Sequence, residues 1–138
     1  MENFNFSINH FAISVVDMKK SIDFYGKFGF VLDREYHSEI VDIIMLKLGE
    51  LSLELFYYPD HNPLPDTAKD LKTDLKIVGC KHFALGVDDI DKAKNFVLSN
   101  NLSKDEIEIV KGRLGKRYFY IKDPNGILIE IIEKEIKL

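Results

Sequence analysis

The stretch HFAISVVDMKKSIDFY, residues 10–25, recurs later in the chain as HFALGVDDIDKAKNFV, residues 82–97. The two stretches align without a gap, so that His10 corresponds to His82. Internal repetition on this scale indicates two similar structural units joined in tandem, because each repeat encodes one supersecondary unit. The residues that the two repeats share therefore indicate both the fold and a candidate functional site.

A second pair of related segments closes each repeat. LSLELF, residues 51–56, corresponds to ILIEII, residues 127–132, and Glu54 falls on Glu130. Each repeat thus carries one His and one Glu at matching positions, and imidazole and carboxylate groups are common ligands of divalent metals. A single His or Glu on a strand is more often structural or solvated. Four such groups at matching positions favour a metal site, because two carboxylates buried together are costly unless a cation neutralises them. A pocket without metal is the alternative.

Length and composition predict a soluble, folded protein that forms a single domain over residues 1–138. Of the 138 residues, 46% are hydrophobic and 30% are charged, which excludes a disordered chain. The net charge of −4 argues against a nucleic acid or an anionic membrane as partner. Cys80 is the single cysteine, so no intrachain disulfide can form, and it is expected to be buried. With no signal peptide or membrane-spanning stretch in the sequence, we expect a cytoplasmic protein.

Each repeat is predicted to fold as a strand, a helix and three further strands. Asp17 and Asp89 stand where helix N-caps belong, directly after the first strand of each repeat. The expected strands are 11–16, 30–35, 41–48 and 51–57 in the first repeat, and 83–87, 107–111, 116–122 and 127–133 in the second. The first module is expected over about residues 8–57 and the second over about 80–135. The joint between them, 58–79, holds three of the four prolines and a short helical stretch, and a lid over the site is one role for it.

Strand alternation and turn chemistry predict which side chains surround the paired His and Glu. A two-residue hairpin loop at Gly49–Glu50 would place Met45 opposite Glu54, with Phe56 on the same face. We therefore expect Met45 and Phe56 to line a small-molecule site in the first repeat.

In the second repeat, the sequence Asp123-Pro124-Asn125-Gly126 suits a three-residue loop with a left-handed bulge at Gly126. That loop would place Tyr120 opposite Glu130 and turn Tyr118 to the same face. A two-residue loop would reverse the faces and turn Arg117 and Phe119 inward instead, and we favour the bulge. Lys47, Lys116 and Arg117 are expected to be solvated charges, with binding of an anionic substrate group as the alternative. His37 and His61 have no counterpart in the other repeat and are expected to be exposed, with a position beside the pocket as the alternative for His61.

These motifs together resemble the vicinal oxygen chelate superfamily, which includes glyoxalase I, methylmalonyl-CoA epimerase, extradiol dioxygenases, fosfomycin-resistance enzymes and bleomycin-binding proteins. The residues that carry the resemblance are His10 before FAISVVDMKKSIDFY, Glu54 in LSLELF, His82 before FALGVDDIDKA, and Glu130 in YIKDPNGILIEIIE. The resemblance implies an α+β fold in which two tandem βαβββ modules form a curved mixed sheet that cups a metal. It also implies a homodimer and a small-molecule substrate.

Within that superfamily the pattern is most similar to bacterial glyoxalase I, which uses one His and one Glu from each module. The resemblance implies that His10, Glu54, His82 and Glu130 bind one divalent ion, Ni, Zn, Mn, Co or Fe. It further implies a lyase or isomerase of the lactoylglutathione lyase type, with Glu130 or Glu54 moving a proton next to the substrate carbonyl.

Two positions depart from glyoxalase I, which usually has Arg at the position of Ser14 and Asn at the position of Tyr58. A glutathione conjugate is therefore not implied as the substrate. Two other functions of the same fold stay open. One is a binding protein of the bleomycin-resistance type, which holds an antibiotic or metabolite without chemistry. The other is an Fe(II) dioxygenase of the extradiol type.

Overall fold

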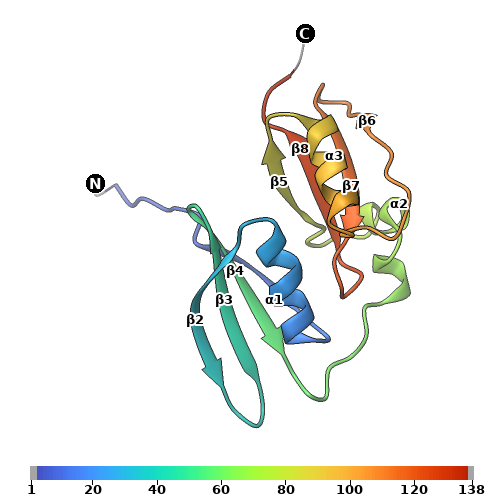
Figure 1. The fold of residues 1–138 in the computed structure, drawn as a ribbon. Helices are drawn as coiled ribbons and strands as arrows, with labels where there is room; N and C mark the ends of the chain where they lie inside the picture. The colour runs from blue at the N-terminus through green and yellow to red at the C-terminus, as the bar shows by residue number, and fades with distance from the viewer. Residues whose placement is uncertain (1–2, 137–138) are drawn as a thin grey trace. The chain divides into compact units, whose positions relative to one another are not determined.

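The computed structural model describes residues 3–136, and the chain divides into two compact units, Met1–His61 and Asn62–Leu138. The division falls inside the predicted joint, 58–79. Each unit contains the order strand, helix, strand, strand, strand, and each builds its own four-stranded mixed sheet (Figure 1). The predicted fold class, α+β with two tandem βαβββ modules, is confirmed. The exact module boundaries stay a prediction.

The first unit follows the predicted element order closely. Its elements are β1 (His10–Ser14), α1 (Met18–Lys27), β2 (Val31–His37), β3 (Asp42–Leu48) and β4 (Leu51–Tyr57). The strands lie in the order β1-β4-β3-β2, with β1 parallel to β4 and the other neighbours antiparallel. The parallel pair forms because the chain between β1 and β4 crosses over through helix α1 before it returns to the sheet.

Helix α1 begins and ends where the sequence predicts. Asp17 caps its N-terminus, since the Asp17 side chain accepts a hydrogen bond from the backbone N–H of Lys20 at 3.0 Å. Gly29, at a φ of +103°, takes the left-handed conformation that follows the end of many helices. The apolar faces of the helix and of the sheet bury a common core that includes Tyr25, Leu46, Leu53 and Leu55, and each fully buried side chain of this size contributes about 1.5–3 kcal/mol.

The second unit repeats the arrangement and adds two short helices before it. Its elements are the 3₁₀ helix η1 (Asp66–Ala68), α2 (Leu71–Leu75), β5 (Phe83–Val87), α3 (Ile90–Ser99), β6 (Val110–Lys111), β7 (Arg117–Lys122) and β8 (Leu128–Glu133). The order of strands, β5-β8-β7-β6, matches that of the first sheet position for position. Asp89 caps α3 as predicted, because its side chain accepts from the backbone N–H groups of Asp91 and Lys92.

Strand β6 is shorter than the predicted strand 107–111. The strand consists of two residues, which pair with β7: Val110 with Tyr118 and Lys111 with Arg117. Ile107 is instead buried, with 4% of its surface exposed. At the start of the segment, burial of Ile107 takes the place of strand pairing. The apolar contact stabilises the chain more than a hydrogen bond at the edge of a sheet, because water can replace that hydrogen bond.

The predicted registers around the paired glutamates are confirmed. Met45 lies opposite Glu54 in β3 and β4, and Tyr120 lies opposite Glu130 in β7 and β8. The loop between β7 and β8 is the three-residue form with a bulge, since Gly126 has a φ of +85° and the N–H of Asp123 donates to the carbonyl of Ile127 at 2.9 Å. The carboxylate of Asp123 also accepts from the N–H groups of Asn125 and Ile127, which fixes the turn.

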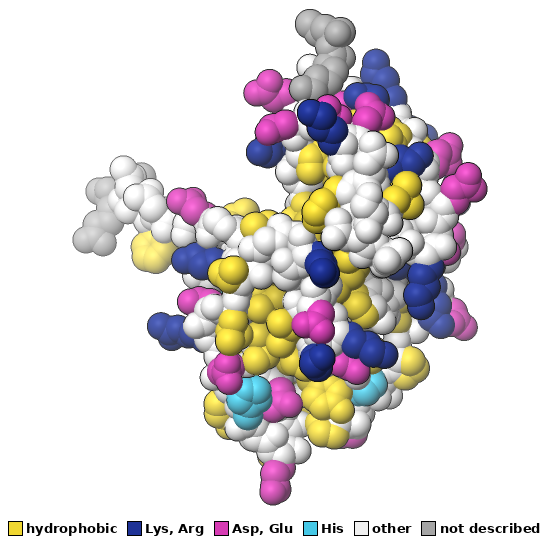
Figure 2. All heavy atoms as spheres, in the orientation of Figure 1, with side chains coloured by type: hydrophobic (Ala, Val, Ile, Leu, Met, Phe, Trp, Pro, Cys, Tyr) yellow, Lys and Arg dark blue, Asp and Glu magenta, His cyan; other side chains and the backbone are white. Residues whose placement is uncertain are grey.

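Charges of both signs are mixed on the surface. Figure 2 shows Lys and Arg side chains interspersed with Asp and Glu on the face in view, without a large region of one sign.

Cys80 is exposed, so the expectation that it is buried is wrong. The reason is that β5 begins only at Phe83, which leaves Cys80 in the chain before the strand. Within residues 3–136, none of the helices has the length and hydrophobicity that crossing a bilayer requires.

Candidate metal centre

His10 and Glu54 form the first half-site, on neighbouring strands of the first sheet. The parallel pairing of β1 and β4 sets Ala12 beside Glu54, and His10, two residues earlier, points to the same face. Nε2 of His10 lies 3.3 Å from Oε1 of Glu54, with 36% and 21% of the two side chains exposed. On the other side of the ring, Nδ1 of His10 lies 2.7 Å from Oδ1 of Asn9. The imidazole is thus oriented through both nitrogens.

His82, Glu130 and Tyr120 form the second half-site, at the matching place in the second sheet. Ala84 pairs with Glu130 as Ala12 pairs with Glu54, and Nε2 of His82 lies 2.9 Å from Oε2 of Glu130. This pair is more buried, with 17% and 14% of the side chains exposed. Among the described residues, Nδ1 of His82 is buried without a hydrogen-bond partner.

The hydroxyl of Tyr120 contacts both partners of the second half-site. It lies 3.0 Å from Nε2 of His82 and donates to Oε2 of Glu130 at 3.3 Å. Burial first, and then the negative charge of Glu130, raise the pKa of Tyr120 well above its ordinary value. The hydroxyl therefore stays protonated and remains a donor to the carboxylate. The ring of Tyr120 also packs edge-on against that of His82, at 5.0 Å between centroids.

The donor atoms of each half-site fit a divalent metal. Two ligands bound to one ion at 2.0–2.2 Å and at right angles lie about 3 Å apart, which is close to the 3.3 and 2.9 Å measured between imidazole nitrogen and carboxylate oxygen. A mixed set of nitrogen and oxygen donors suits first-row divalent ions such as Ni, Zn, Mn, Co or Fe. Within each unit, however, the described residues include no group of three or more His, Cys, Asp or Glu side chains arranged to hold an ion. One half-site alone supplies two ligands.

The predicted lining residues lie on the same faces as the half-sites. Met45 is half-buried opposite Glu54, and Phe56 lies two residues after Glu54 on β4. In the second unit Tyr118 is half-buried and its ring packs against that of Tyr120, at 5.5 Å between centroids. Each half-site is therefore bordered by apolar or aromatic side chains of its own sheet.

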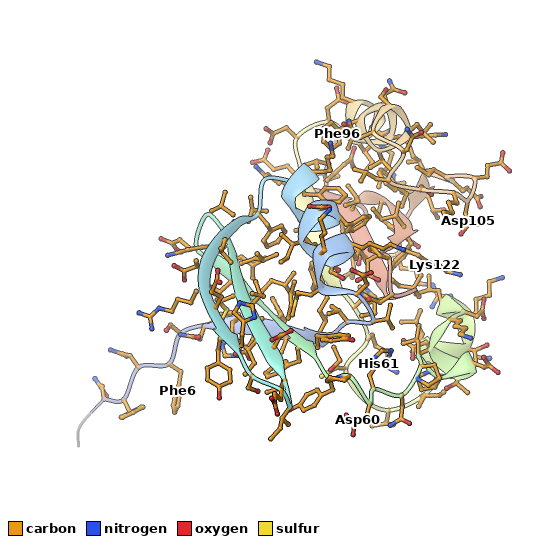
Figure 3. The ribbon with its side chains drawn as sticks, turned by 60° about the horizontal axis from the view of Figure 1, so that its bottom comes forward. Phe6, Asp60, His61, Phe96, Asp105 and Lys122 are labelled. Atoms are coloured by element: carbon orange, nitrogen blue, oxygen red, sulfur yellow. The ribbon has the colours of Figure 1, made fainter. Side chains whose placement is uncertain are left out.

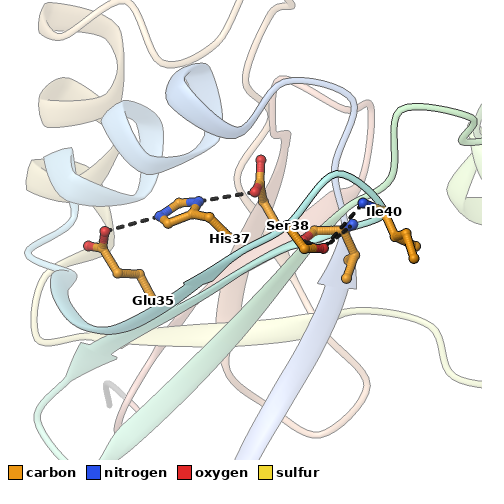
Figure 4. A network of polar contacts seen from close by, with 6 residues as sticks. Glu35, His37, Ser38 and Ile40 are labelled. Carbon is orange, nitrogen blue, oxygen red and sulfur yellow. Dashed lines mark hydrogen bonds and ion pairs between the residues drawn. The ribbon is translucent and has the colours of Figure 1, made fainter.

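The two remaining histidines are exposed, as predicted, and lie outside the half-sites. His37 ends β2, and its Nε2 and Nδ1 each lie 3.0 Å from a carboxylate oxygen, of Glu35 and Asp42 respectively (Figure 4). Both ring nitrogens must carry a proton to donate to both carboxylates, and these hydrogen bonds, first to Glu35 and then to Asp42, raise the pKa of His37. His61 lies in the loop after β4 (Figure 3), with Nδ1 2.8 Å from the carbonyl oxygen of Tyr58.

Arg117, expected to be a solvated charge, keeps 38% of its side chain exposed and also forms an ion pair with the buried Glu133. Its Nη2 lies 2.8 Å from Oε1 of Glu133, its Nε donates to the same oxygen at 3.0 Å, and its backbone N–H donates to Oε2 at 2.9 Å. Glu133 is 1% exposed, so the carboxylate depends on these donors. This ion pair could have been predicted from the register. Strands that pair Tyr120 with Glu130 also set the oppositely charged Arg117 and Glu133 across from each other.

Comparison with known proteins places the fold and its two repeats in one family. The sequence model described as the glyoxalase/bleomycin resistance protein/dioxygenase superfamily matches residues 7–131. The chain belongs to this superfamily. The resemblance stated from its motifs is thereby confirmed, and both half-sites fall within the matched residues.

Individual relatives agree with this assignment. The uncharacterised protein YaeR of Escherichia coli K12 is 30% identical over 131 residues, which cover 92% of this chain and 95% of YaeR. A glyoxalase family protein from Enterococcus faecalis has a similar structure, with a TM-score of 0.76 and 25% identity over 92% of this chain and 97% of its own. Lactoylglutathione lyase from Agrobacterium tumefaciens shares the fold, with a TM-score of 0.64 and 22% identity over 93% of each chain.

Proposed function

We propose that this superfamily member is a metal-dependent lyase or isomerase of the glyoxalase I type, which transfers a proton next to a carbonyl group of a small oxygenated substrate. The observation that carries the proposal is the duplicated pair of donors. Each repeat sets an imidazole nitrogen within 3.3 or 2.9 Å of a carboxylate oxygen, at matching positions of its sheet. Membership of the glyoxalase superfamily supports the same function.

His10, Glu54, His82 and Glu130 would hold one divalent ion, with the two half-sites supplied either by one chain or by two chains of a homodimer. Two neutral imidazoles and two carboxylates balance the charge of such an ion. When bound, the ion would polarise the substrate carbonyl and so acidify the neighbouring C–H group.

Glu130 is the proposed base that removes and returns this proton. It is the more buried of the two glutamates, at 14% exposed against 21% for Glu54, so it is better shielded from competing water. The hydroxyl of Tyr120 donates to Oε2 of Glu130 and holds the carboxylate in one orientation. In the part of the chain that the structure describes, Glu54 contacts His10 and no hydroxyl group of this kind, so it is proposed to serve mainly as a ligand.

Substrate binding is assigned to the side chains that border the half-sites. Met45, Phe56, Tyr118 and Tyr120 present apolar and aromatic surface that would exclude water from the reacting groups. Arg117 is committed to the buried carboxylate of Glu133 and is not available for an anionic substrate group. A compact substrate, rather than a large anionic conjugate, suits these residues best.

Elemental analysis of the purified protein tests this proposal. We expect about one divalent ion per chain, and replacing His82 with Ala should weaken its affinity by at least about 10²-fold, more than the loss of a group that only supports a ligand. His61→Ala is the matched control and should keep full occupancy, since His61 lies outside both half-sites, with its Nδ1 against the carbonyl of Tyr58 and its ring against that of Tyr57. Wild-type protein that cannot be loaded with Ni, Zn, Mn, Co or Fe would overturn the metal site.

A metal-free small-molecule binding protein is the second candidate. The observation that favours it is the close contact between His82 and Glu130, because an imidazole N–H and a carboxylate at 2.9 Å satisfy each other's hydrogen-bonding capacity without an ion. Such a protein would bind its ligand with the same affinity before and after treatment with a chelator. A glyoxalase-type enzyme would lose its turnover under the same treatment.

A further inference from the structure

The two half-site histidines are held by different parts of the chain. His10 is the first residue of β1, and its backbone is paired with Ser52 in the sheet. His82 precedes β5, whose first pair is Phe83 with Ile129, so the ladder ends one residue short of it. Strand pairing therefore fixes the backbone of His10 but not that of His82.

The residue before each histidine also differs, Asn9 in one repeat and Lys81 in the other. The amide oxygen of Asn9 contacts Nδ1 of His10 directly, at 2.7 Å. Lys81 makes its hydrogen bonds to Asp74, and Nδ1 of His82 has no partner among the described residues. The first half-site thus orients its imidazole through the side chain of the preceding residue, whereas in the second half-site Tyr120 contacts the imidazole and the preceding residue binds elsewhere.

Lys81 instead fastens the chain beside His82 to helix α2. Its ammonium group donates to the backbone carbonyl of Asp74 at 2.6 Å and to Oδ1 of Asp74 at 3.3 Å. The side chains of Lys81 and Asp74 are 19% and 14% exposed. The carbonyl of Asp74, in the last turn of α2, also accepts from the backbone N–H of Ile77 at 3.0 Å, so Lys81 adds a further donor to this helix end. Partial burial makes such a contact harder for water to replace.

Helix α2 is itself fixed at its start and through the chain before it. The carboxylate of Asp70 caps the helix by accepting from the backbone N–H of Thr73 at 3.0 Å and from its hydroxyl at 2.8 Å. Earlier in the joint, Leu64 packs on Gly126, where an added Cβ would lie 3.2 Å from Leu64 Cδ2. Gly126 belongs to the loop that leads into β8 and Glu130. The joint therefore contacts two segments: the residue directly before His82, and the loop that precedes β8, the strand that carries Glu130.

We propose that Lys81 is a positioning residue, which holds His82 toward Glu130 by anchoring the chain before β5 to Asp74 of helix α2. The joint between the repeats then has a specific task, since it supplies the support that strand pairing and Asn9 give to His10. The placement of His82 is independent of the proposed function; its consequence for metal binding rests on that function.

Two-dimensional NMR of the histidine rings in the full-length, metal-free protein tests the placement of His82. Lys81→Met keeps the aliphatic stem and removes the ammonium group. We expect displaced ring signals for His82 and about tenfold faster amide exchange near residue 82, while the signals of His10, His37 and His61 stay in place. Lys81→Arg should restore the His82 signals, and Lys76→Met, at an exposed lysine that follows α2, should leave them unchanged. Unchanged His82 signals in Lys81→Met would overturn the proposal.

Asp74→Asn provides a milder second variant in case Lys81→Met fails to fold. It keeps the backbone carbonyl and removes only the charge of the longer contact, so a smaller displacement in the same direction is expected, and none at all would overturn the proposal. Metal titration then separates the two proposals. If both hold, Lys81→Met weakens metal affinity about 10–100-fold, as the loss of a group that orients a ligand does. Displaced His82 signals in a protein whose wild type binds no metal would uphold the positioning role and refute the metal centre.

Discussion

The His10–Glu54 and His82–Glu130 pairs stand at matching positions of two repeated sheets, and their surroundings differ in three respects. The first pair is more exposed, its histidine is fixed by strand pairing, and the side chain of Asn9 contacts the ring. The second pair is more buried, its histidine precedes β5, and it contacts the hydroxyl of Tyr120. The two repeats therefore share the donor atoms and differ in the residues around them. Under the proposed function, this difference would allow Glu130 to serve as the base and Glu54 as a ligand.

The largest expected effect comes from exchanging each glutamate for glutamine. Glu130→Gln should lower turnover about 10²–10⁴-fold, because the amide cannot accept the proton, while part of the metal binding remains. Glu54→Gln should lower turnover less, because an amide oxygen can still act as a weak ligand. Steady-state kinetics with a substrate found by screening small hydroxy- and keto-carbonyl compounds measures both. Equal losses would remove the distinction between the two half-sites, and full activity of metal-loaded Glu130→Gln would exclude Glu130 as the base.

A smaller effect is expected when the hydroxyl of Tyr120 is removed. Tyr120→Phe keeps the ring packed on His82 but deletes the donor to Glu130, so we expect about a tenfold fall in turnover, which corresponds to the loss of one hydrogen bond of about 1.4 kcal/mol. Tyr118→Phe is the matched control, because it keeps the aromatic ring that borders the half-site and removes a hydroxyl that, within residues 3–136, contacts neither His82 nor Glu130. If both variants lose the same activity, the role of Tyr120 in distinguishing the second half-site is wrong.

The smallest effect concerns His37, which has two carboxylate neighbours and no part in either half-site. Its folded-state pKa is raised above 6.5, so the stability that the network contributes is present below pH 6.5 and is lost as the pH rises through the folded-state value. The groups that face the ring are Glu35 on β2 and Asp42 on β3, and Asp42 in turn pairs with Tyr57 on β4. Urea unfolding at pH 5.5 and at pH 8.5 should show a smaller pH dependence in His37→Gln than in the wild type. Equal dependence in both proteins would exclude the network as its source.

Much of the fold follows from local signals in the sequence. The duplicated stretches predicted the two βαβββ units, and the caps at Asp17 and Asp89 marked the helix starts. Turn chemistry was informative beyond the turns themselves, because the left-handed Gly126 fixes the register that sets Tyr120 opposite Glu130. A register propagates along a whole strand, so one correctly identified loop places every side chain on it.

The features that were missed depend on contacts between distant segments. The anchor from Lys81 to Asp74 joins a helix of the joint to the chain before β5, and no periodicity encodes it. The exposure of Cys80 and the short β6 follow from where a strand starts or stops pairing, which depends on its neighbours rather than on its own residues. Burial of Glu133 was missed because a charged residue near a strand end is ordinarily solvated.

If both repeats contribute ligands to one metal centre, as proposed, X-ray absorption spectroscopy of the cobalt-loaded protein will detect a single shared environment. We expect two imidazoles per ion, with nitrogen and oxygen ligands at about 2.0–2.2 Å. His10→Ala and His82→Ala should each reduce the imidazole count to one. A wild-type spectrum with a single imidazole per ion, left unchanged by one of the two replacements, would contradict the claim and show that the half-sites act separately.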